Sequence, residues 1–351
     1  MPYRVAIIGC GRMACTIDDE SSSRLRQTGL VLPRCHASGY VAVEDTELVA
    51  ACDIDSERLH VARERWHIPR GYQDYRECII AEQPDLISVT TRPENHAEII
   101  VFAVAHGVKG LFVEKPLCCS LAETDAIGAA CERHGVQLEF GPMRRNWAAF
   151  QQARTLAASR DLGPVRSVIA FGGNPCGGHL LDTALYLLGD PEPAGVQATL
   201  GQLSPHEGDT ANMRFKPDAP IQVARTTFEN GMALYVCGTG ASGEYGEYEL
   251  VCEAGRIRIV NDGAALQVRR FMEEARAFEE VAIAPIAHWN GTVHKVRDLV
   301  QAVQTGQPGV SNLRATIIGQ EIGYAMYESH LQGGTEVSVP IANRERWVSS
   351  W

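Results

Sequence analysis

The stretch Arg4-Val5-Ala6-Ile7-Ile8-Gly9-Cys10-Gly11-Arg12-Met13-Ala14 decides the expected fold, because it joins an apolar strand to a glycine-rich turn. In such a turn the first glycine, Gly9, permits the tight bend, and the second, Gly11, lets the backbone approach a pyrophosphate. The small third residue, Ala14, allows the following turn to pack closely on the strand. The stretch therefore predicts a dinucleotide-binding turn near the N-terminus.

Residues 1–117 alternate between apolar runs typical of buried strands and segments with helical periodicity. We expect strands at residues 4–9, 47–53, 86–90 and 110–114, and helices at residues 56–66, 75–82 and 94–106. A helix at residues 120–134, whose Ser120 and Glu123 form a capping box, and a strand at residues 136–140 complete this half. The alternation predicts an α/β Rossmann domain over residues 1–140, built on a doubly wound parallel sheet.

The second half of the chain has a different pattern, in which one helix is followed by many short strands. A strand at residues 165–171 leads into a helix at 179–188, and further strands are expected at 196–203, 209–215, 221–229, 232–238, 248–253, 256–260 and 266–270. Two helices, at residues 288–305 and 313–331, close the chain. Residues 141–351 are therefore expected to form an α+β domain with a large, mainly antiparallel open sheet. An open sheet often forms a subunit interface, so we expect a homo-oligomer, either a dimer or a tetramer.

Composition limits the possible partners. A chain of 351 residues with 45% hydrophobic content can form two domains. The net charge of −11 disfavours nucleic acid, and no apolar run reaches the ~20 residues of a membrane helix. A strand begins directly after the N-terminus, so we expect a cytoplasmic protein. The 11 cysteines lack a Cys-x-x-Cys pair, so we expect reduced, buried thiols and no metal site.

Asp53, at the end of the second expected strand, is the candidate ligand of the adenosine ribose. Such an acid normally follows the glycine-rich turn by ~20 residues, but Asp53 follows Gly9 by 44. An insertion at about residues 18–35 explains the excess, and we expect it near the cofactor or a neighbouring subunit. Asp53 would bind ribose hydroxyls and repel a 2′-phosphate, which favours NAD over NADP. Its alternative role, as a helix N-cap, is better filled by Ser56.

Lys115 follows the strand at residues 110–114, at the edge of a parallel sheet where such folds bind ligands. His179 and Asp182 are three residues apart, so they share one face of a helix. Hydride transfer from an alcohol requires a base for the hydroxyl proton, which a histidine can accept while an ammonium stabilises the alkoxide. A helix-terminal histidine with only a packing role is the alternative reading of His179. His36, His206, His288 and His294 show no metal-ligand pattern and are left out of the predicted site.

These pieces together resemble the glucose–fructose oxidoreductase/inositol dehydrogenase/MocA (Gfo/Idh/MocA) family along essentially the whole chain. The resemblance rests on short motifs in matching order: Ile7-Ile8-Gly9-Cys10-Gly11-Arg12-Met13, Val49-Ala50-Ala51-Cys52-Asp53, Thr91-Arg92-Pro93-Glu94-Asn95-His96, Glu114-Lys115-Pro116-Leu117 and Gly178-His179-x-x-Asp182.

The resemblance implies a role for each matching position. It implies that the catalytic residues are Lys115, His179 and Asp182, and that the bond before Pro116 is cis, as it often is in relatives. It implies a cofactor site formed by Gly9, Gly11, Arg12, Met13, Asp53, Thr91, His96, Glu114 and Lys115, with Glu114 against the nicotinamide ribose.

One position departs from the family pattern. Many dehydrogenases of the family carry an aspartate four residues before the histidine, where this chain has Pro175 in a glycine-rich loop. Either Asp182 takes over the polar role, or the substrate and chemistry differ. Arg145 and Trp147 are candidate substrate contacts, although structural use of both residues is as common.

Three functions are compatible with these observations. The first is an NAD-dependent dehydrogenase acting on a secondary alcohol of a sugar, sugar derivative or cyclitol, with Lys115 and His179 handling the proton. The second is an enzyme with tightly bound NAD that uses transient oxidation for glycoside cleavage, elimination or epimerisation. The third is a non-catalytic dinucleotide-binding sensor, which would have no need for Lys115, His179 and Asp182 together.

Overall fold

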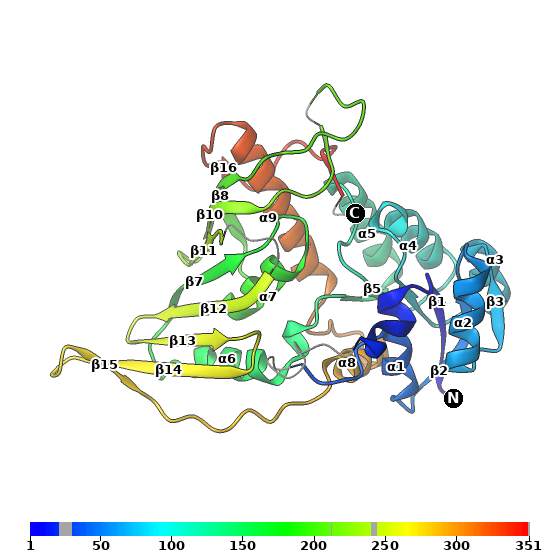
Figure 1. The fold of residues 1–351 in the computed structure, drawn as a ribbon, viewed down its shortest axis with the longest axis horizontal. Coiled ribbons are helices and arrows are strands. Elements are labelled where there is room, and N and C mark those ends of the chain that lie inside the picture. The colour runs from blue at the N-terminus through cyan, green and yellow to red at the C-terminus, as the bar shows by residue number, and fades with distance from the viewer. Residues whose placement is uncertain (21–29, 212, 240–243, 350–351) are drawn as a thin grey trace. The chain divides into compact units, whose positions relative to one another are not determined.

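The computed structural model describes residues 1–20, 30–211, 213–239 and 244–349 (Figure 1). The chain divides into two compact units, and the first is discontinuous in sequence. It contains residues 1–20, Val31–Asn146 and Asn290–Thr316, whereas the second is formed mainly by Trp147–Trp289 and Ile317–Trp351. The segment Asn290–Thr316 thus belongs to the N-terminal unit. The division predicted from the sequence placed this segment in the second domain, residues 141–351.

The first unit is a six-stranded parallel sheet in the order β3-β2-β1-β4-β5-β6. Its strands are β1 (Tyr3–Ile8), β2 (Thr46–Cys52), β3 (Arg70–Tyr72), β4 (Leu86–Val89), β5 (Gly110–Val113) and β6 (Gln137–Phe140). Its α-helices are α1 (His36–Val41), α2 (Ser56–Trp66), α3 (Tyr75–Glu82), α4 (His96–Ala105), α5 (Leu121–His134) and α8 (Gly291–Thr305). The predicted Rossmann fold is confirmed.

Two hydrophobic clusters cover the two faces of this sheet. Successive residues of a strand point to opposite faces, so Leu111 and Val113 of β5 belong to one cluster and Phe112 belongs to the other. The Phe112 side also contains residues of α1 and α8. Full burial of each large apolar side chain contributes about 1.5–3 kcal/mol, so α8 is a structural part of this domain despite its distance in sequence.

The first βα connection departs from a simple Rossmann unit. The glycine-rich turn leads into a π-helical turn, η1 (Arg12–Thr16), and a 3₁₀ turn, η2 (Ile17–Asp19), in place of a long helix. Asp18 Oδ1 accepts hydrogen bonds from the backbone of Arg34 (2.6 Å) and Cys35 (3.3 Å), which closes the base of the insertion. The expected contact of this insertion with cofactor or subunit falls largely on residues 21–29, which lie outside the described residues.

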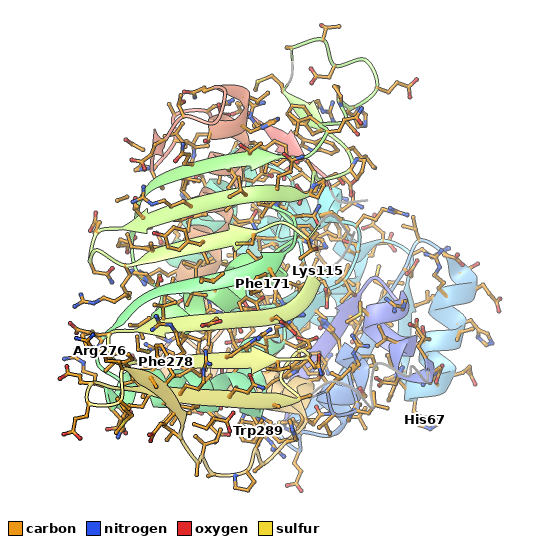
Figure 2. All side chains as sticks on the ribbon, turned by 60° about the vertical axis from the view of Figure 1, so that its left-hand side comes forward. His67, Lys115, Phe171, Arg276, Phe278 and Trp289 are labelled. Carbon is orange, nitrogen blue, oxygen red and sulfur yellow. The ribbon has the colours of Figure 1, made fainter. Side chains whose placement is uncertain are left out.

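The second unit is a nine-stranded sheet in the order β15-β14-β13-β12-β7-β11-β10-β8-β16 (Figure 2). Its paired strands are antiparallel except for β7 and β11, which are parallel, so the predicted mainly antiparallel sheet is confirmed. The strands are β7 (Val165–Gly172), β8 (Pro193–Leu200), β10 (Ile221–Phe228), β11 (Ala233–Cys237), β12 (Glu244–Cys252), β13 (Gly255–Val260), β14 (Ala265–Met272), β15 (Ala277–Glu280) and β16 (Val337–Ser338). A separate pair joins β9 (Arg214–Phe215) to β17 (Trp347–Val348).

Helices cover one face of the broad sheet. Helix α6 (Ala148–Ser159) packs on β13 and β14, and α7 (His179–Leu188) packs on β7 and β12. Helix α9 (Leu313–Leu331) follows α8. The opposite face carries exposed side chains such as Val223 and Tyr235.

Three local expectations are wrong. Asp55, and not Ser56, caps α2, because its Oδ1 accepts from the backbone of Glu57 and Arg58. The strand expected at residues 209–215 is reduced to Arg214–Phe215, since Asp209 binds the amides of residues 211, 213 and 214 and makes a turn. Cys237 is exposed, whereas the other ten cysteines are buried, and all are free.

The described part of the chain contains no helix that is both long and apolar enough to span a bilayer.

Candidate active site

The glycine-rich turn after β1 has the geometry that its motif predicts. Gly9 has φ = 95°, and a Cβ there would lie 2.8 Å from the backbone of Thr90 and Thr91. Both features require glycine. A Cβ on Gly11, by contrast, would meet no atom of the described residues within 4 Å. Gly11 therefore borders open space, which suits the close approach of a pyrophosphate to the backbone.

Asp53 ties the end of β2 to this turn. Its Oδ2 accepts a hydrogen bond from the backbone N–H of Cys10 (2.7 Å), and its Oδ1 accepts from Asp55 (2.9 Å). The role of N-cap belongs to Asp55, so Asp53 is not needed there. A carboxylate has lone pairs beyond these two bonds, and the predicted ribose contact remains compatible with this position.

Arg12 and Met13 follow the turn with different environments. The Arg12 guanidinium is exposed and pairs with the carboxylate of Glu20 through two of its nitrogens. Met13 packs against the hydrophobic cluster on the Phe112 side of the sheet. The cofactor contacts of both residues stay predictions.

The Glu-Lys-Pro turn directly follows β5. The Glu114 backbone N–H donates to Val89 at the end of β4 (2.8 Å), and the Lys115–Pro116 peptide is cis, as the resemblance implies. A Cβ on Gly141 would lie 2.9 Å from Glu114 Cα and 3.0 Å from Lys115 N. The turn is therefore confined by backbone on both sides, at the carboxyl edge of the parallel sheet.

The Glu114 side chain points into the protein, where only 7% of the residue is exposed. Its Oε1 lies 3.2 Å from His36 Nε2, and its Oε2 accepts from the Lys115 backbone N–H (3.0 Å). Burial alone raises the pKa of Glu114, but the hydrogen bond from His36 and the Lys115 charge outweigh it and lower the pKa to about 2. Glu114 is therefore an ionised carboxylate that accepts hydrogen bonds.

His36 is a functional candidate that the sequence reasoning missed. It is buried at the start of α1, with Nδ1 2.8 Å from the Ser88 hydroxyl and its ring stacked on Phe112 at 3.6 Å between centroids. The only available signal was Ser88 itself, a lone polar residue inside the buried strand β4. A buried hydroxyl needs a partner, but the sequence does not show which residue supplies it.

Lys295 of α8 is a second missed residue. Its fully buried Nζ donates to the Phe140 carbonyl (2.6 Å) and the Ser311 hydroxyl (2.7 Å), and lies 3.4 Å from Glu139 Oε2. Burial raises the pKa of Glu139 to about 8, in spite of the opposing effect of Lys295. Gly141 directly follows Phe140 and abuts the Glu-Lys-Pro turn. The hydrogen bond from Lys295 to the Phe140 carbonyl therefore supports that turn indirectly.

His96 bridges two loops at the sheet edge. Its Nε2 lies 3.1 Å from the Thr91 carbonyl, and its Nδ1 lies 3.0 Å from that of Pro116. Burial lowers its pKa below the usual value. His96 and Thr91 thus stand beside the predicted cofactor turn, and their contact with a cofactor remains a prediction.

His179 and Asp182 lie in the second unit, in the first turn of α7. His179 is half-buried and Asp182 is buried. The preceding loop contains three glycines with positive φ: Gly172 (77°), Gly173 (91°) and Gly178 (86°). These conformations favour glycine, so backbone geometry determines where α7 begins.

Asp218 supports the loop that contains Pro175 through hydrogen bonds. Asp218 Oδ2 accepts from the Cys176 backbone N–H (2.9 Å), and its Oδ1 accepts from the Tyr327 hydroxyl (2.8 Å). A Cβ on Gly323 of α9 would lie 2.5 Å from the Pro175 carbonyl oxygen. Pro175 is buried in a tightly supported loop, and Asp218 is a further residue that the sequence reasoning did not single out.

The two predicted substrate residues have structural partners. Arg145 donates from Nη1 to the Val310 carbonyl (3.3 Å) inside the first unit. In the second unit Trp147 packs edge-on against Phe150, which packs in turn against Tyr248. Contact of Arg145 or Trp147 with a substrate stays a prediction without support from these neighbours.

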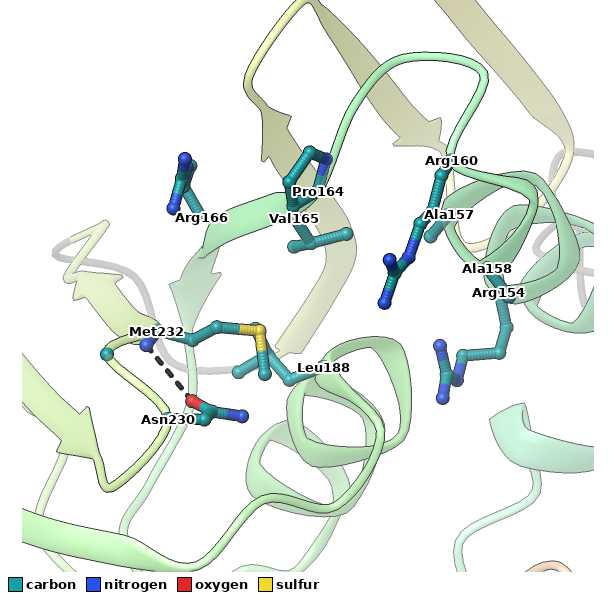
Figure 3. A pocket seen from close by; sticks show the side chains of 11 residues that line it. Arg154, Ala157, Ala158, Arg160, Pro164, Val165, Arg166, Leu188, Asn230 and Met232 are labelled. Atoms are coloured by element: carbon teal, nitrogen blue, oxygen red, sulfur yellow. Dashed lines mark hydrogen bonds between the residues drawn. The ribbon is translucent and has the colours of Figure 1, made fainter.

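A hollow of about 440 Å³ lies in the second unit, among the ends of α6, α7 and β7 (Figure 3). Three arginines, Arg154, Arg160 and Arg166, line it beside Leu188 and Met232. Leu188 ends α7, whereas His179 begins it, and nine steps of ~1.5 Å separate them along the helix axis. The hollow is therefore distinct from the candidate active-site residues of this unit.

Comparison with known proteins concerns the family and the fold. The profile of the Gfo/Idh/MocA family, described as "Oxidoreductase family, NAD-binding Rossmann fold", matches residues 3–141, which agrees with the predicted family over that part of the chain. D-apiose dehydrogenase of Paraburkholderia graminis is 29% identical over 208 residues, which cover 54% of this chain and 50% of that protein. D-glucoside 3-dehydrogenase of Escherichia coli is 26% identical over 219 residues, covering 56% of this chain and 57% of that protein. The chain thus matches about half the length of these curated relatives.

The fold extends over the whole chain. An NAD binding oxidoreductase from Klebsiella pneumoniae superposes with a TM-score of 0.76 at 19% identity, covering 97% of this chain and all (100%) of that structure. At this identity the likeness concerns the fold alone.

Proposed function

We propose that the protein is an NAD-dependent dehydrogenase of secondary alcohols, because residues 3–141 match the profile of the Gfo/Idh/MocA oxidoreductases. Its substrate class would be a sugar, a sugar derivative or a cyclitol, which matches the names of the D-apiose and D-glucoside dehydrogenases to which it is similar. The observation that carries the proposal is the Glu-Lys-Pro turn, which places Lys115 at the carboxyl edge of the parallel sheet.

The residues of the first unit fit a dinucleotide. Gly9 and Gly11 would hold the pyrophosphate against backbone, and Asp53 would accept hydrogen bonds from the adenosine ribose. The Asp53 carboxylate would also repel a 2′-phosphate, so we propose NAD as the cofactor in preference to NADP. When bound, NAD supplies the acceptor for the hydride.

Lys115 and His179 would handle the proton of the reaction. Oxidation of a carbinol carbon needs the hydroxyl proton to leave as the hydride departs, so that a neutral ketone forms. The ammonium of Lys115 would stabilise the developing alkoxide, and His179 would accept the proton. Asp182, three residues along the same helix face, would orient the histidine.

Calorimetric titration with NAD and with NADP tests the cofactor assignment, and an NADH-absorbance screen against polyols, aldoses and cyclitols tests the reaction. Tighter binding of NAD and substrate-dependent absorbance are the expected results. Binding without absorbance across the panel would instead favour retained NAD with a closed redox cycle, or a sensor. Absence of dinucleotide binding would overturn the proposal.

We also propose that the protein is a homo-oligomer that pairs through the open face of the nine-stranded sheet. Val223 and Tyr235 on that face are 55% and 41% exposed. Light scattering coupled to gel filtration tests this, with a dimer or tetramer expected for the wild type and a smaller species for Val223→Lys with Tyr235→Lys. A wild-type monomer would contradict it.

A further inference from the structure

Four buried side chains form one polar chain beneath the Glu-Lys-Pro turn. The Ser88 hydroxyl of β4 donates to the Tyr40 hydroxyl (3.2 Å) and lies 2.8 Å from His36 Nδ1. His36 Nε2 then lies 3.2 Å from Glu114 Oε1. No more than 1% of Tyr40, Ser88 or His36 is exposed, so water does not compete for these bonds.

The direction of the last bond follows from chemistry. An ionised carboxylate can only accept hydrogen bonds, so His36 Nε2 carries the hydrogen and donates it to Glu114. The ring cannot turn freely, because it is stacked on Phe112 with an interplanar angle of 17°. The position of His36 Nε2 is thus determined by β4 and β5, and it determines where the Glu114 carboxylate lies.

The second carboxylate oxygen of Glu114 bonds to the Glu-Lys-Pro turn itself. Oε2 accepts from the Lys115 backbone N–H at 3.0 Å, so the carboxylate links the His36 ring directly to the Lys115 backbone. With 7% of the residue exposed, little of this side chain reaches the surface where a cofactor would bind. Through these contacts Glu114 supports the backbone of Lys115, and its carboxylate is poorly placed to bind the nicotinamide ribose.

We infer that His36 is a positioning residue, which holds the Glu114 carboxylate inward so that Glu114 fixes the Lys115 backbone. This inference rests on the proposed dehydrogenase function for its kinetic consequence. Loss of the His36 bond would free the Glu114 carboxylate to rotate toward solvent, and Lys115 would lose its fixed position. Misplacement of a reacting group by about 1 Å can cost ~10²-fold in rate.

Two matched substitutions separate this role from simple packing. His36→Gln retains an amide N–H near the position of Nε2, whereas His36→Asn retains one near Nδ1 and loses reach to Glu114. Both variants lose the stacked ring, so their stability losses should be similar. The measurements are kcat with an active polyol, the Kd of NAD by calorimetry, and deuterium exchange of the peptide that contains the Lys115 amide.

We expect His36→Asn to have a kcat at least about tenfold below that of His36→Gln, with faster exchange at the Lys115 amide and a Kd for NAD within about threefold of the wild type. Equal kcat and equal exchange in the two variants would overturn the inference. A weaker Kd for NAD with unchanged kcat would also overturn it, because Glu114 would then be a ribose ligand.

The exchange measurement needs no substrate, so it decides the role of His36 even where the wild type oxidises no alcohol and the proposed function fails. Should both His36 variants fail to fold, Ser88→Ala removes the hydroxyl that contacts His36 Nδ1 and the Tyr40 hydroxyl, and it leaves the His36 ring in place. We then expect a smaller fall in kcat with faster exchange at Lys115, and unchanged exchange there would contradict the inference.

Discussion

The turn that carries Lys115 and the loop that carries His179 are positioned by different physical means. Buried polar side chains, His36 and Glu114, hold the Lys115 turn through side-chain hydrogen bonds. Positive-φ glycines hold the His179 loop, with support from Asp218 beneath Cys176. A parallel sheet can recruit side chains from several neighbouring strands to one edge, whereas a loop before a helix depends on its own backbone conformation.

The difference predicts how each region fails. The Lys115 turn should be sensitive to charge and hydrogen bonding, because its support contains an ionised carboxylate. The His179 loop should be sensitive to backbone conformation and to the hydroxyl of Tyr327. Four experiments, from the largest expected effect to the smallest, test this contrast.

Replacement of Lys115 by methionine should have the largest effect. We expect kcat/KM to fall by roughly 10²–10⁴-fold, the range typical for loss of a proton-handling group. Methionine retains most of the chain length, so the melting temperature should change little. Steady-state kinetics with calorimetry checks this, and kcat/KM within about threefold of the wild type would remove Lys115 from the chemistry.

Glu114→Gln should alter the pH dependence of stability. The folded pKa of Glu114, about 2, lies below the ordinary 4.5, so its ionised form stabilises the fold above about pH 4.5. This contribution, up to about 3 kcal/mol, is lost as the pH falls from 4.5 toward 2. Urea unfolding at several pH values should show a wild-type advantage over Glu114→Gln at pH 6 that shrinks in acid. A constant difference would contradict the inward, hydrogen-bonded carboxylate.

A pair of glycine substitutions compares the two regions directly. Gly141→Ala would place a Cβ 2.9 Å from Glu114 Cα, and these backbone atoms cannot move aside easily. We therefore expect the free energy of unfolding to fall by roughly 1–3 kcal/mol and the activity to be lost. Gly177→Ala is the matched control in the His179 loop, where the nearest atom is Asn174 Cβ at 3.6 Å. In chemical unfolding, Gly177→Ala should have a free energy of unfolding close to that of the wild type. Equal losses in both variants would show that the contrast in packing is not real.

Tyr327→Phe should have the smallest effect. It removes a hydroxyl that donates to Asp218 Oδ1 (2.8 Å) and accepts from the Ala219 backbone N–H (2.9 Å). We expect a loss of about 1 kcal/mol in unfolding free energy, with a lower kcat and an unchanged Kd for NAD, since the cofactor residues lie in the other unit. A weaker Kd for NAD would contradict independent support of the two regions.

Much of the fold was predictable because its signals are local. The bounds of α2, α3 and α7 match their periodic segments, and the predicted sixth strand, residues 136–140, was one residue longer than β6. The errors have identifiable causes: Asp55 competes with Ser56 for the same cap, and the Asp209 side chain captures amides that a strand would have used. Helix α6 and strand β3 were not singled out: the buried face of α6 consists mostly of alanine, and β3 has only three residues.

The sequence by itself determined which residues could carry chemistry, because glycine turns, strand ends and helix starts depend on neighbours within a few positions. The tertiary structure alone decided what holds those residues in place. His36 is 78 residues from Glu114, and Lys295 is 155 residues from Phe140. A buried polar group must find a partner, but only the folded chain brings the two together, so the partner has no local signature.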